Sequence, residues 1–167
     1  ANPGIRTGGF AGESKSEILG QLGAAAACYV LIRSEFSAAV RVNAATRFLE
    51  ESGLEFPVVL KPDVGERGSG VAIIHSLREM STYLARADKD VIVQRYVPGV
   101  EFGLFYIRRP SQERGRIFSI TEKIFPRVRG DGRRSLDELI LDDRRAACMA
   151  DAYRNSATRP LDMVPLN

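Results

Sequence analysis

The stretch Phe56-Pro-Val-Val-Leu-Lys61-Pro-Asp-Val-Gly65-Glu-Arg-Gly68-Ser-Gly70-Val-Ala-Ile-Ile74 decides the fold of this chain. An apolar run ends on a lysine and a proline, crosses a loop with three glycines, and resumes as a second apolar run rich in β-formers. This pattern predicts a strand, a glycine loop and a second strand. A lysine at a strand end beside a flap with free backbone N–H groups is typical of phosphate binding.

Two better-known phosphate loops do not fit this stretch. In a Walker A loop the lysine follows the glycines and opens a helix, whereas Lys61 precedes them and a strand follows. A dinucleotide-binding fingerprint also requires a helix next. The remaining possibility is a hairpin whose tip folds over a polyphosphate. Lys61 or Arg67 would supply the positive charge, and Ser69 a hydroxyl group. The alternative is a solvent-exposed hairpin tip, with Lys61 extending from the strand end to water.

A second segment, Ile92-Val-Gln94-Arg-Tyr-Val97-Pro-Gly-Val-Glu101, lies one strand and one helix later. Backbone N–H and C=O groups at such a strand end can pair with the edge of an adenine. The carboxylate of Glu101 can accept hydrogen bonds from ribose hydroxyls. The alternative for Glu101 is an ordinary charge on an edge strand.

Together with Gly130-Asp-Gly-Arg-Arg-Ser-Leu-Asp-Glu-Leu-Ile140, these segments resemble the ATP-grasp superfamily. Within it they are most similar to carboxylate–amine ligases of the D-alanine–D-alanine ligase and cyanophycin synthetase type. The resemblance covers roughly residues 53–141. It implies an α+β fold: an ATP-grasp nucleotide-binding subdomain, in which helices flank an antiparallel sheet, followed by the start of a second subdomain.

The resemblance also implies roles for the matching residues. Lys61 corresponds to a lysine that holds the nucleotide phosphates, Glu101 to the ribose carboxylate, and Lys123 to a later lysine that reaches the phosphates. The implied nucleotide-binding residues are Lys61, Gly65, Arg67, Gly68, Ser69, Gly70, Gln94, Arg95, Tyr96, Val97, Glu101 and Lys123. The family has an earlier lysine as well, but residues 31–60 contain none, so either Arg33 or Arg41 substitutes for it or the feature is absent.

Charge is unevenly distributed along the chain. Residues 107–134 hold nine Arg and Lys against three Asp and Glu, a net +6, so that the remainder carries 3 − 6 = −3. This segment favours an acidic or carboxylate-bearing substrate, with Arg127 and Arg129 as the candidate contacts. The alternatives for these arginines are holding phosphate charge, packing, and an ordinary place on exposed strand faces. A nucleic-acid binder is less favoured, because the segment has no recognised fold signature for it.

ATP-grasp ligases phosphorylate a carboxylate with ATP, and an amine then displaces phosphate from the acyl phosphate. Their Mg²⁺ ions are held by an Asp and a Glu-x-Asn pair. This chain has four asparagines, and none has a glutamate two residues before it. We therefore expect the ATP-binding portion of a carboxylate–amine or carboxylate–thiol ligase: a fragment inactive alone, without the C-terminal metal-binding half, with ATP and Mg²⁺ as cofactors.

The alternative function is a nucleotide-binding regulatory module without chemistry. No catalytic residue and no metal ligand is predicted in this chain. Asp142 and Asp143 are candidate ligands by charge, but an exposed charge cluster is favoured for them. His75 has no partner in sequence for a metal site or a catalytic triad.

The predicted organisation has three parts: residues 1–36 with no derived role, residues 37–96 as the first subdomain, and residues 97–167 as part of the second with an irregular tail. Ser-x-x-Glu patterns at Ser14, Ser76 and Ser135 predict capping boxes that open helices. The apolar runs 101–107 and 117–125 predict two neighbouring antiparallel strands.

Several observations bear on location and partners. No apolar run reaches the length of a membrane-spanning helix, and the first residues do not form a signal peptide. Cys28 and Cys148 lie among small apolar residues, which is typical of a reduced, cytoplasmic protein. We expect ATP and small carboxylate and amine substrates as partners, and no membrane or nucleic acid. Apolar surface left open on a partial fold favours a homodimer.

Overall fold

The structure is a computed structural model that describes residues 12–65, 68–123 and 128–156. The chain forms two compact units, Ala1–Val97 and Pro98–Asn167, each of which is described by itself. Strand β1 (Tyr29–Ile32), which comes from the sequence segment 1–36, is part of the sheet of the first unit.

The first unit is built on a four-stranded sheet with the strand order β1-β4-β2-β3, in which all neighbours are antiparallel. Its other strands are β2 (Val58–Pro62), β3 (Ala72–Ile74) and β4 (Val91–Arg95). Leu60 pairs with Ala72 across the glycine loop, so the predicted strand, loop and strand are confirmed. The predicted α+β class with antiparallel sheets is confirmed as well.

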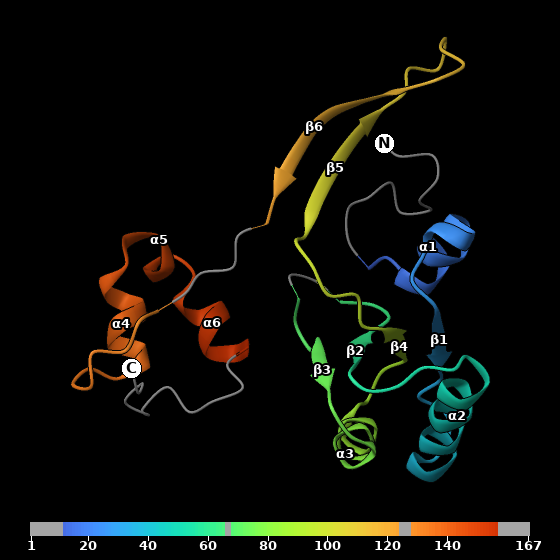
Figure 1. Ribbon diagram of the computed structural model, residues 1–167, viewed down its shortest axis with the longest axis horizontal. Helices are drawn as coiled ribbons and strands as arrows, with labels where there is room; N and C mark the ends of the chain where they lie inside the picture. The colour runs from blue at the N-terminus through green and yellow to red at the C-terminus, as the bar shows by residue number, and fades with distance from the viewer. Residues whose placement is uncertain (1–11, 66–67, 124–127, 157–167) are drawn as a thin grey trace. The chain divides into compact units, whose positions relative to one another are not determined.

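Helices α2 (Ala38–Glu51) and α3 (Leu77–Arg86) pack side by side on one face of this sheet (Figure 1). Strand residues alternate between the two faces, which places Val58 and Leu60 on the helix side and Lys61 on the other. The core between helices and sheet consists of Ile32, Ala45, Leu49, Val58, Leu60, Ile74, Met80, Leu84, Val91 and Val93.

The other face of the sheet is approached by α1 (Lys15–Leu22), which continues into a 3₁₀ turn at Gly23–Ala25. The Tyr29 hydroxyl of β1 donates to the carbonyl oxygen of Ser16 at 3.0 Å. Ile92 is fully buried, although its register partner Lys61 lies on the face turned away from α2 and α3. Hydrogen bonds thus hold the start of α1 against β1 and the end of β2.

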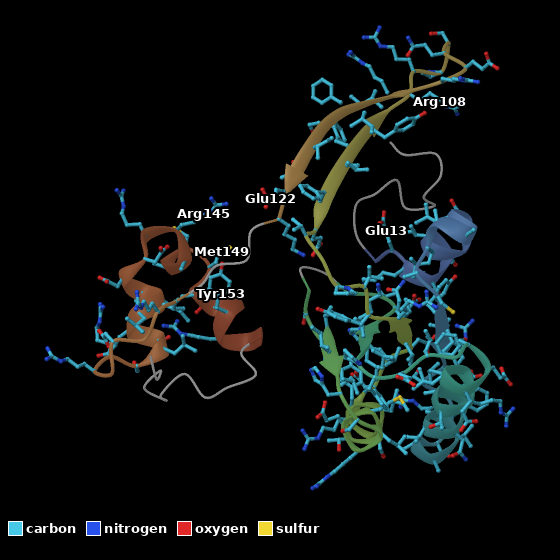
Figure 2. The ribbon with its side chains drawn as sticks, in the orientation of Figure 1. Glu13, Arg108, Glu122, Arg145, Met149 and Tyr153 are labelled. Carbon is cyan, nitrogen blue, oxygen red and sulfur yellow. The ribbon has the colours of Figure 1, made fainter. Side chains whose placement is uncertain are left out.

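The second unit contains a hairpin of β5 (Phe102–Ile107) and β6 (Arg116–Glu122), with a bulge at Phe105/Tyr106. The predicted antiparallel pairing of these neighbours is confirmed. In Figure 2, Arg108 lies toward the tip of the hairpin and Glu122 at its base. Three short helices follow, α4 (Leu136–Asp142), α5 (Arg144–Ala147) and α6 (Ala150–Ser156), with Ile140, Ala146 and Ala150 as their buried contact.

The three predicted helix starts each carry a serine cap. The hydroxyl oxygens accept from the backbone N–H three residues on, at 3.2, 3.3 and 3.3 Å for Ser14, Ser76 and Ser135. The reciprocal bond of a capping box is present at Ser135, whose N–H donates to Glu138 at 2.7 Å. For α3, which begins after Ser76, the predicted reciprocal bond is wrong. The Glu79 carboxylate accepts from the N–H of His75 instead, at 2.9 Å.

Other sequence features have structural roles. Asp143 caps α5 by accepting from the N–H groups of Arg145 and Ala146, and Asp142 pairs with Arg134 at 2.9 Å. Cys28 and Cys148 are both free thiols. Among the described helices, none combines the length and apolarity that crossing a membrane requires.

Candidate phosphate-binding site

Lys61 points away from the helices and is held by a glutamine on the neighbouring strand. Its Nζ donates to Gln94 Oε1 at 2.7 Å, and Gln94 Nε2 donates to the carbonyl oxygen of Ala27 at 3.0 Å. Gln94 and Lys61 are diagonal neighbours on β4 and β2, since Lys61 pairs with Ile92. The glutamine therefore fixes the direction of the lysine side chain along the sheet.

A second lysine, from the start of α1, reaches the same end of β2. Lys15 Nζ donates to the carbonyl oxygens of Pro62, Asp63 and Gly65 at 3.3, 3.1 and 2.8 Å. The backbone N–H of Lys15 donates to the carbonyl oxygen of Asp63 at 3.1 Å. The first residue of α1 thus fastens the start of the glycine loop through four hydrogen bonds.

Asp63 joins this loop start to two other segments. Its side chain is buried, and Oδ1 accepts from the N–H of Ser16 at 2.7 Å. A carboxylate in this position satisfies a free N–H of the first helical turn and stabilises the positive end of the helix dipole. Its own N–H donates to the carbonyl oxygen of Asp90 at 2.8 Å.

The electrostatics of the site centre on two neighbouring ammonium groups. Burial lowers the pKa of Lys61 below its ordinary value, and the positive charge of Lys15 lowers that pKa further. Each cause disfavours the charged form of Lys61, and a nearby anion would offset them by favouring that form. The arrangement is therefore suited to a group with several negative charges, such as a polyphosphate.

The glycine loop itself is open to solvent at Gly65, Gly68, Ser69 and Gly70. Gly68 and Gly70 have φ of 76° and 72°, in the left-handed region that favours glycine. The carbonyl oxygen of Gly70 accepts from the Tyr83 hydroxyl of α3 at 2.5 Å. Arg67, predicted as a phosphate contact, lies outside the described residues.

The predicted adenine segment follows directly at the end of the sheet. Gln94 is engaged with Lys61, and the N–H of Arg95 donates to the carbonyl oxygen of Cys28 at 2.9 Å. Tyr96 is half-buried, and Val97 is 66% exposed. The exposed end of this segment leaves apolar surface for a flat ring to pack on.

Two further predicted residues pair with each other within the second unit. Lys123 Nζ lies 2.9 Å from Glu101 Oε1, and the N–H of Lys123 donates to the carbonyl oxygen of Glu101 at 2.8 Å. Both side chains are more than half exposed. Of the predicted substrate contacts, Arg129 is exposed and Arg127 lies outside the described residues.

Lys15 and Asp63 were missed at the sequence level. The suggestion that Arg41 substitutes for an earlier lysine is wrong, because Arg41 is buried on α2 and donates to the carbonyl oxygen of Ala87 at 2.9 Å. Arg33 forms an ion pair with Asp90 at 3.0 Å. The only signal for Lys15 was its place in the first turn of a helix with a serine cap.

Magnesium is a cofactor that the resemblance implies. Across residues 12–65, 68–123 and 128–156, no three His, Cys, Asp or Glu side chains gather into a group that could hold a metal ion. These residues do not supply a magnesium site by themselves.

Comparison with known proteins points in the same direction as the motifs. No protein-family model matches the chain. The cyanophycin synthetase of Geminocystis herdmanii (strain PCC 6308) is 30% identical to it over 110 residues, which are 62% of this chain and 12% of that protein.

Two solved structures align with this chain over 85% of its length and 47% of theirs. The D-alanine–D-alanine ligase of Helicobacter pylori does so with a TM-score of 0.41 and 18% identity, and that of Bacillus anthracis with 0.36 and 16%. Because both TM-scores are below 0.5, the comparison rests on the sequence similarity to cyanophycin synthetase. The chain is thus similar over part of its length to cyanophycin synthetase, which supports its resemblance to the ATP-grasp carboxylate–amine ligases.

Proposed function

We propose that this chain is the ATP-binding portion of a ligase that joins a carboxylate to an amine or a thiol. One observation carries the proposal: the ammonium groups of Lys15 and Lys61 are electrostatic neighbours at the end of β2, where an exposed glycine loop begins. Two cations beside an exposed glycine-rich backbone fit the phosphates of a nucleotide. The sequence similarity to cyanophycin synthetase supports the same assignment.

The proposed reaction has two steps. A carboxylate oxygen attacks the γ-phosphorus of ATP and ADP leaves, which gives an acyl phosphate. The amine or thiol then attacks the acyl carbon, and inorganic phosphate leaves. In this scheme Lys61 and Lys15 neutralise phosphate charge and residues 65–70 cover the phosphates.

The other parts of the nucleotide are assigned by the resemblance. Residues 94–97 pair with the adenine, Glu101 accepts hydrogen bonds from the ribose hydroxyls, and Lys123 adds positive charge at the phosphates. Arg127 and Arg129 contact the carboxylate substrate.

Thermal unfolding with nucleotide tests the proposal. ATP or ADP at about 100 times its Kd would stabilise the chain by about 2.7 kcal/mol and raise its melting temperature. We expect Lys61→Met to abolish this rise, because its ammonium group faces the phosphates. Arg47→Met is the matched control, since Arg47 is exposed on α2 and contacts no part of the site. An unchanged melting temperature of the wild-type chain in millimolar ATP and ADP would refute nucleotide binding.

A nucleotide-binding regulatory module is the second candidate, favoured by the lack of a metal-ligand group among residues 12–65, 68–123 and 128–156. Because this portion is expected to be inactive alone, the two functions are separated by hydroxylamine trapping in a protein that also carries the metal-binding half. An acyl phosphate formed there is converted to a hydroxamate. ATP-dependent hydroxamate formation with any of a panel of carboxylates, run with Mg²⁺, supports the ligase. Nucleotide binding without hydroxamate across the panel supports the module.

A further inference from the structure

A cavity of about 400 Å³ lies on the helix side of the first unit, away from the face that carries Lys61. Its lining residues are Pro62, Gly70, Thr82, Tyr83, Arg86, Ala87, Asp88, Lys89 and Val91. Val91, Ala87 and Pro62 give it an apolar floor, and the ring of the half-buried Tyr83 forms a wall. Cavities of this size with an apolar floor and a few polar groups are typical of small-molecule sites.

The rim of the cavity is positively charged. Arg86 and Lys89 are exposed on it, against the single carboxylate of Asp88. None of these three side chains has an ion pair with another described residue in the structure. Two cations and one anion without internal partners favour a ligand with a negative group.

The end of helix α3 beside the cavity does not oppose an anion. A helix C-terminus carries partial negative charge on its free carbonyl groups. Arg86 occupies the last turn, and buried Arg41 donates from Nη1 to the carbonyl oxygen of Ala87 at 2.9 Å. Nε and Nη2 of Arg41 have no hydrogen-bond partner among the described residues, so its charge is little compensated. Both guanidinium groups offset the negative helix end.

We propose that this cavity binds a small monocarboxylate with an apolar body. The apolar body packs on Val91, Pro62 and the ring of Tyr83, and the carboxylate is bound by Arg86 and Lys89. The side chains of this site lie on the opposite face of the sheet from Lys61, and the site meets the proposed nucleotide site at Gly70 of the loop.

The cavity also touches the glycine loop. The Tyr83 hydroxyl in its wall donates to the carbonyl oxygen of Gly70, and Pro62 and Gly70 line both the cavity and the loop. A ligand against Tyr83 restricts the motion of this loop end, which lowers the conformational entropy lost when a nucleotide binds. This part of the inference rests on the proposed nucleotide function, whereas carboxylate binding does not.

Phenylacetate is the probe for the carboxylate site, with benzyl alcohol and benzylamine as analogues without the negative charge. Ligand-observed NMR with the full chain should show phenylacetate binding at millimolar concentration and little binding of the other two. Arg86→Ala/Lys89→Ala should weaken phenylacetate about tenfold or more, because both charge-assisted contacts are lost. Asp88→Asn, on the same rim, should bind phenylacetate as well as the wild-type chain or better.

Three results would overturn the binding site: no phenylacetate binding at millimolar concentration, equal binding of benzylamine, or unchanged affinity in the double variant. Lys61→Met must retain phenylacetate binding, so this site can hold even if the chain binds no nucleotide. Because Arg86 and Lys89 are exposed, circular dichroism should show that the double variant is folded.

The coupling is tested by titrating ATP with and without saturating phenylacetate. We expect the Kd for ATP to fall by about threefold or more with phenylacetate, and the Kd for phenylacetate to fall by the same factor with ATP. Tyr83→Phe removes only the hydroxyl, so it should keep phenylacetate binding and lose the coupling. An ATP Kd that does not change with phenylacetate in the wild-type chain would refute the coupling.

Discussion

Lys61 lies half-buried beside a second ammonium group, and each circumstance disfavours its charged form. Its folded-state pKa is below the ordinary value of 10.5, so the folded chain binds fewer protons than the unfolded chain between these two values. Stability therefore rises with pH across that window, as Lys61 loses its proton in the folded state. At neutral pH the charged lysine opposes folding, as expected of a group kept for binding an anion.

Removing the charge of Lys15 should raise the pKa of Lys61. In Lys15→Met the pKa should move part of the way back toward 10.5 and stay below it, because burial is the larger cause. The pH-dependent rise in stability should shrink accordingly. NMR titration of the lysine side chains measures the pKa, with Arg47→Met as the control for loss of a distant charge. A Lys61 pKa that is unchanged in Lys15→Met would contradict the electrostatic coupling.

At this scale the sequence predicted Lys61 and the loop, because they are contiguous and the chemistry shows in their order. It missed Lys15 and Asp63, whose contacts join residues 47 to 50 positions apart. Nothing in the local pattern of Ser14-Lys-Ser-Glu17 indicates where that helix start will dock. The two substitutes named for an earlier lysine, Arg33 and Arg41, are engaged elsewhere: Arg33 pairs with Asp90, and Arg41 lies on the other side of the sheet.

The hairpin of β2 and β3 depends on two glycines with different surroundings. Both Gly68 and Gly70 have positive φ, but a Cβ added at Gly68 meets open space. A Cβ at Gly70 would lie 2.8 Å from Pro62 Cγ and 3.1 Å from its Cδ. The two positions thus separate the cost of the backbone conformation from the cost of a clash.

Gly68→Ala should lower the free energy of unfolding by about 1 kcal/mol, the usual cost of a side chain at positive φ. Gly70→Ala should lower it by about 2–4 kcal/mol, because the proline ring must also move. Urea denaturation of the two variants measures the difference, and each serves as the control for the other. Equal losses in the two variants would show that Pro62 moves aside without cost.

Strands and helices of the first unit were the more predictable elements. In α2 the apolar residues Ala38, Val42, Ala45 and Leu49 recur at helical spacing, and β2 and β4 are β-rich runs between turns. The face on which α1 packs was not predictable, because a short helix with few apolar residues carries little information about its partner. Likewise, the pattern Ser76-x-x-Glu79 predicts a capping box, but the Glu79 carboxylate can accept from the N–H of His75 as well as from that of Ser76.

At the scale of the whole molecule, the charge excess of residues 107–134 is partly compensated. Arg134 pairs with Asp131 at 2.6 Å and with Asp142 at 2.9 Å, and Lys123 pairs with Glu101. The hydrogen bonds of Asp131 to Arg134 and Arg133 hold its pKa well below the usual range of an aspartate. Sequence counting overstates the charge available to a partner, because the acids that neutralise it lie partly outside the segment.

The hairpin of β5 and β6 exposes apolar side chains along both strands. Leu104 and Ile120 pair across the strands, and their side chains are 61% and 63% exposed. Phe105 and Phe118 make an edge-to-face contact at 5.9 Å and are also more than half exposed. So much apolar surface on a two-stranded ribbon favours association with another surface. The homodimer expected from the sequence stays a prediction.

Opposite charges on one face of this hairpin should abolish self-association. Leu104→Lys/Ile120→Glu replaces an apolar pair with a cross-strand ion pair, so the hairpin is retained while the apolar area is lost. Light scattering over a range of concentrations should show oligomers of the wild-type chain and monomers of this variant. Ser119→Glu is the control, because it adds a charge on the adjacent β6 position without removing an apolar group. A wild-type chain that is monomeric at every concentration would refute self-association through the hairpin.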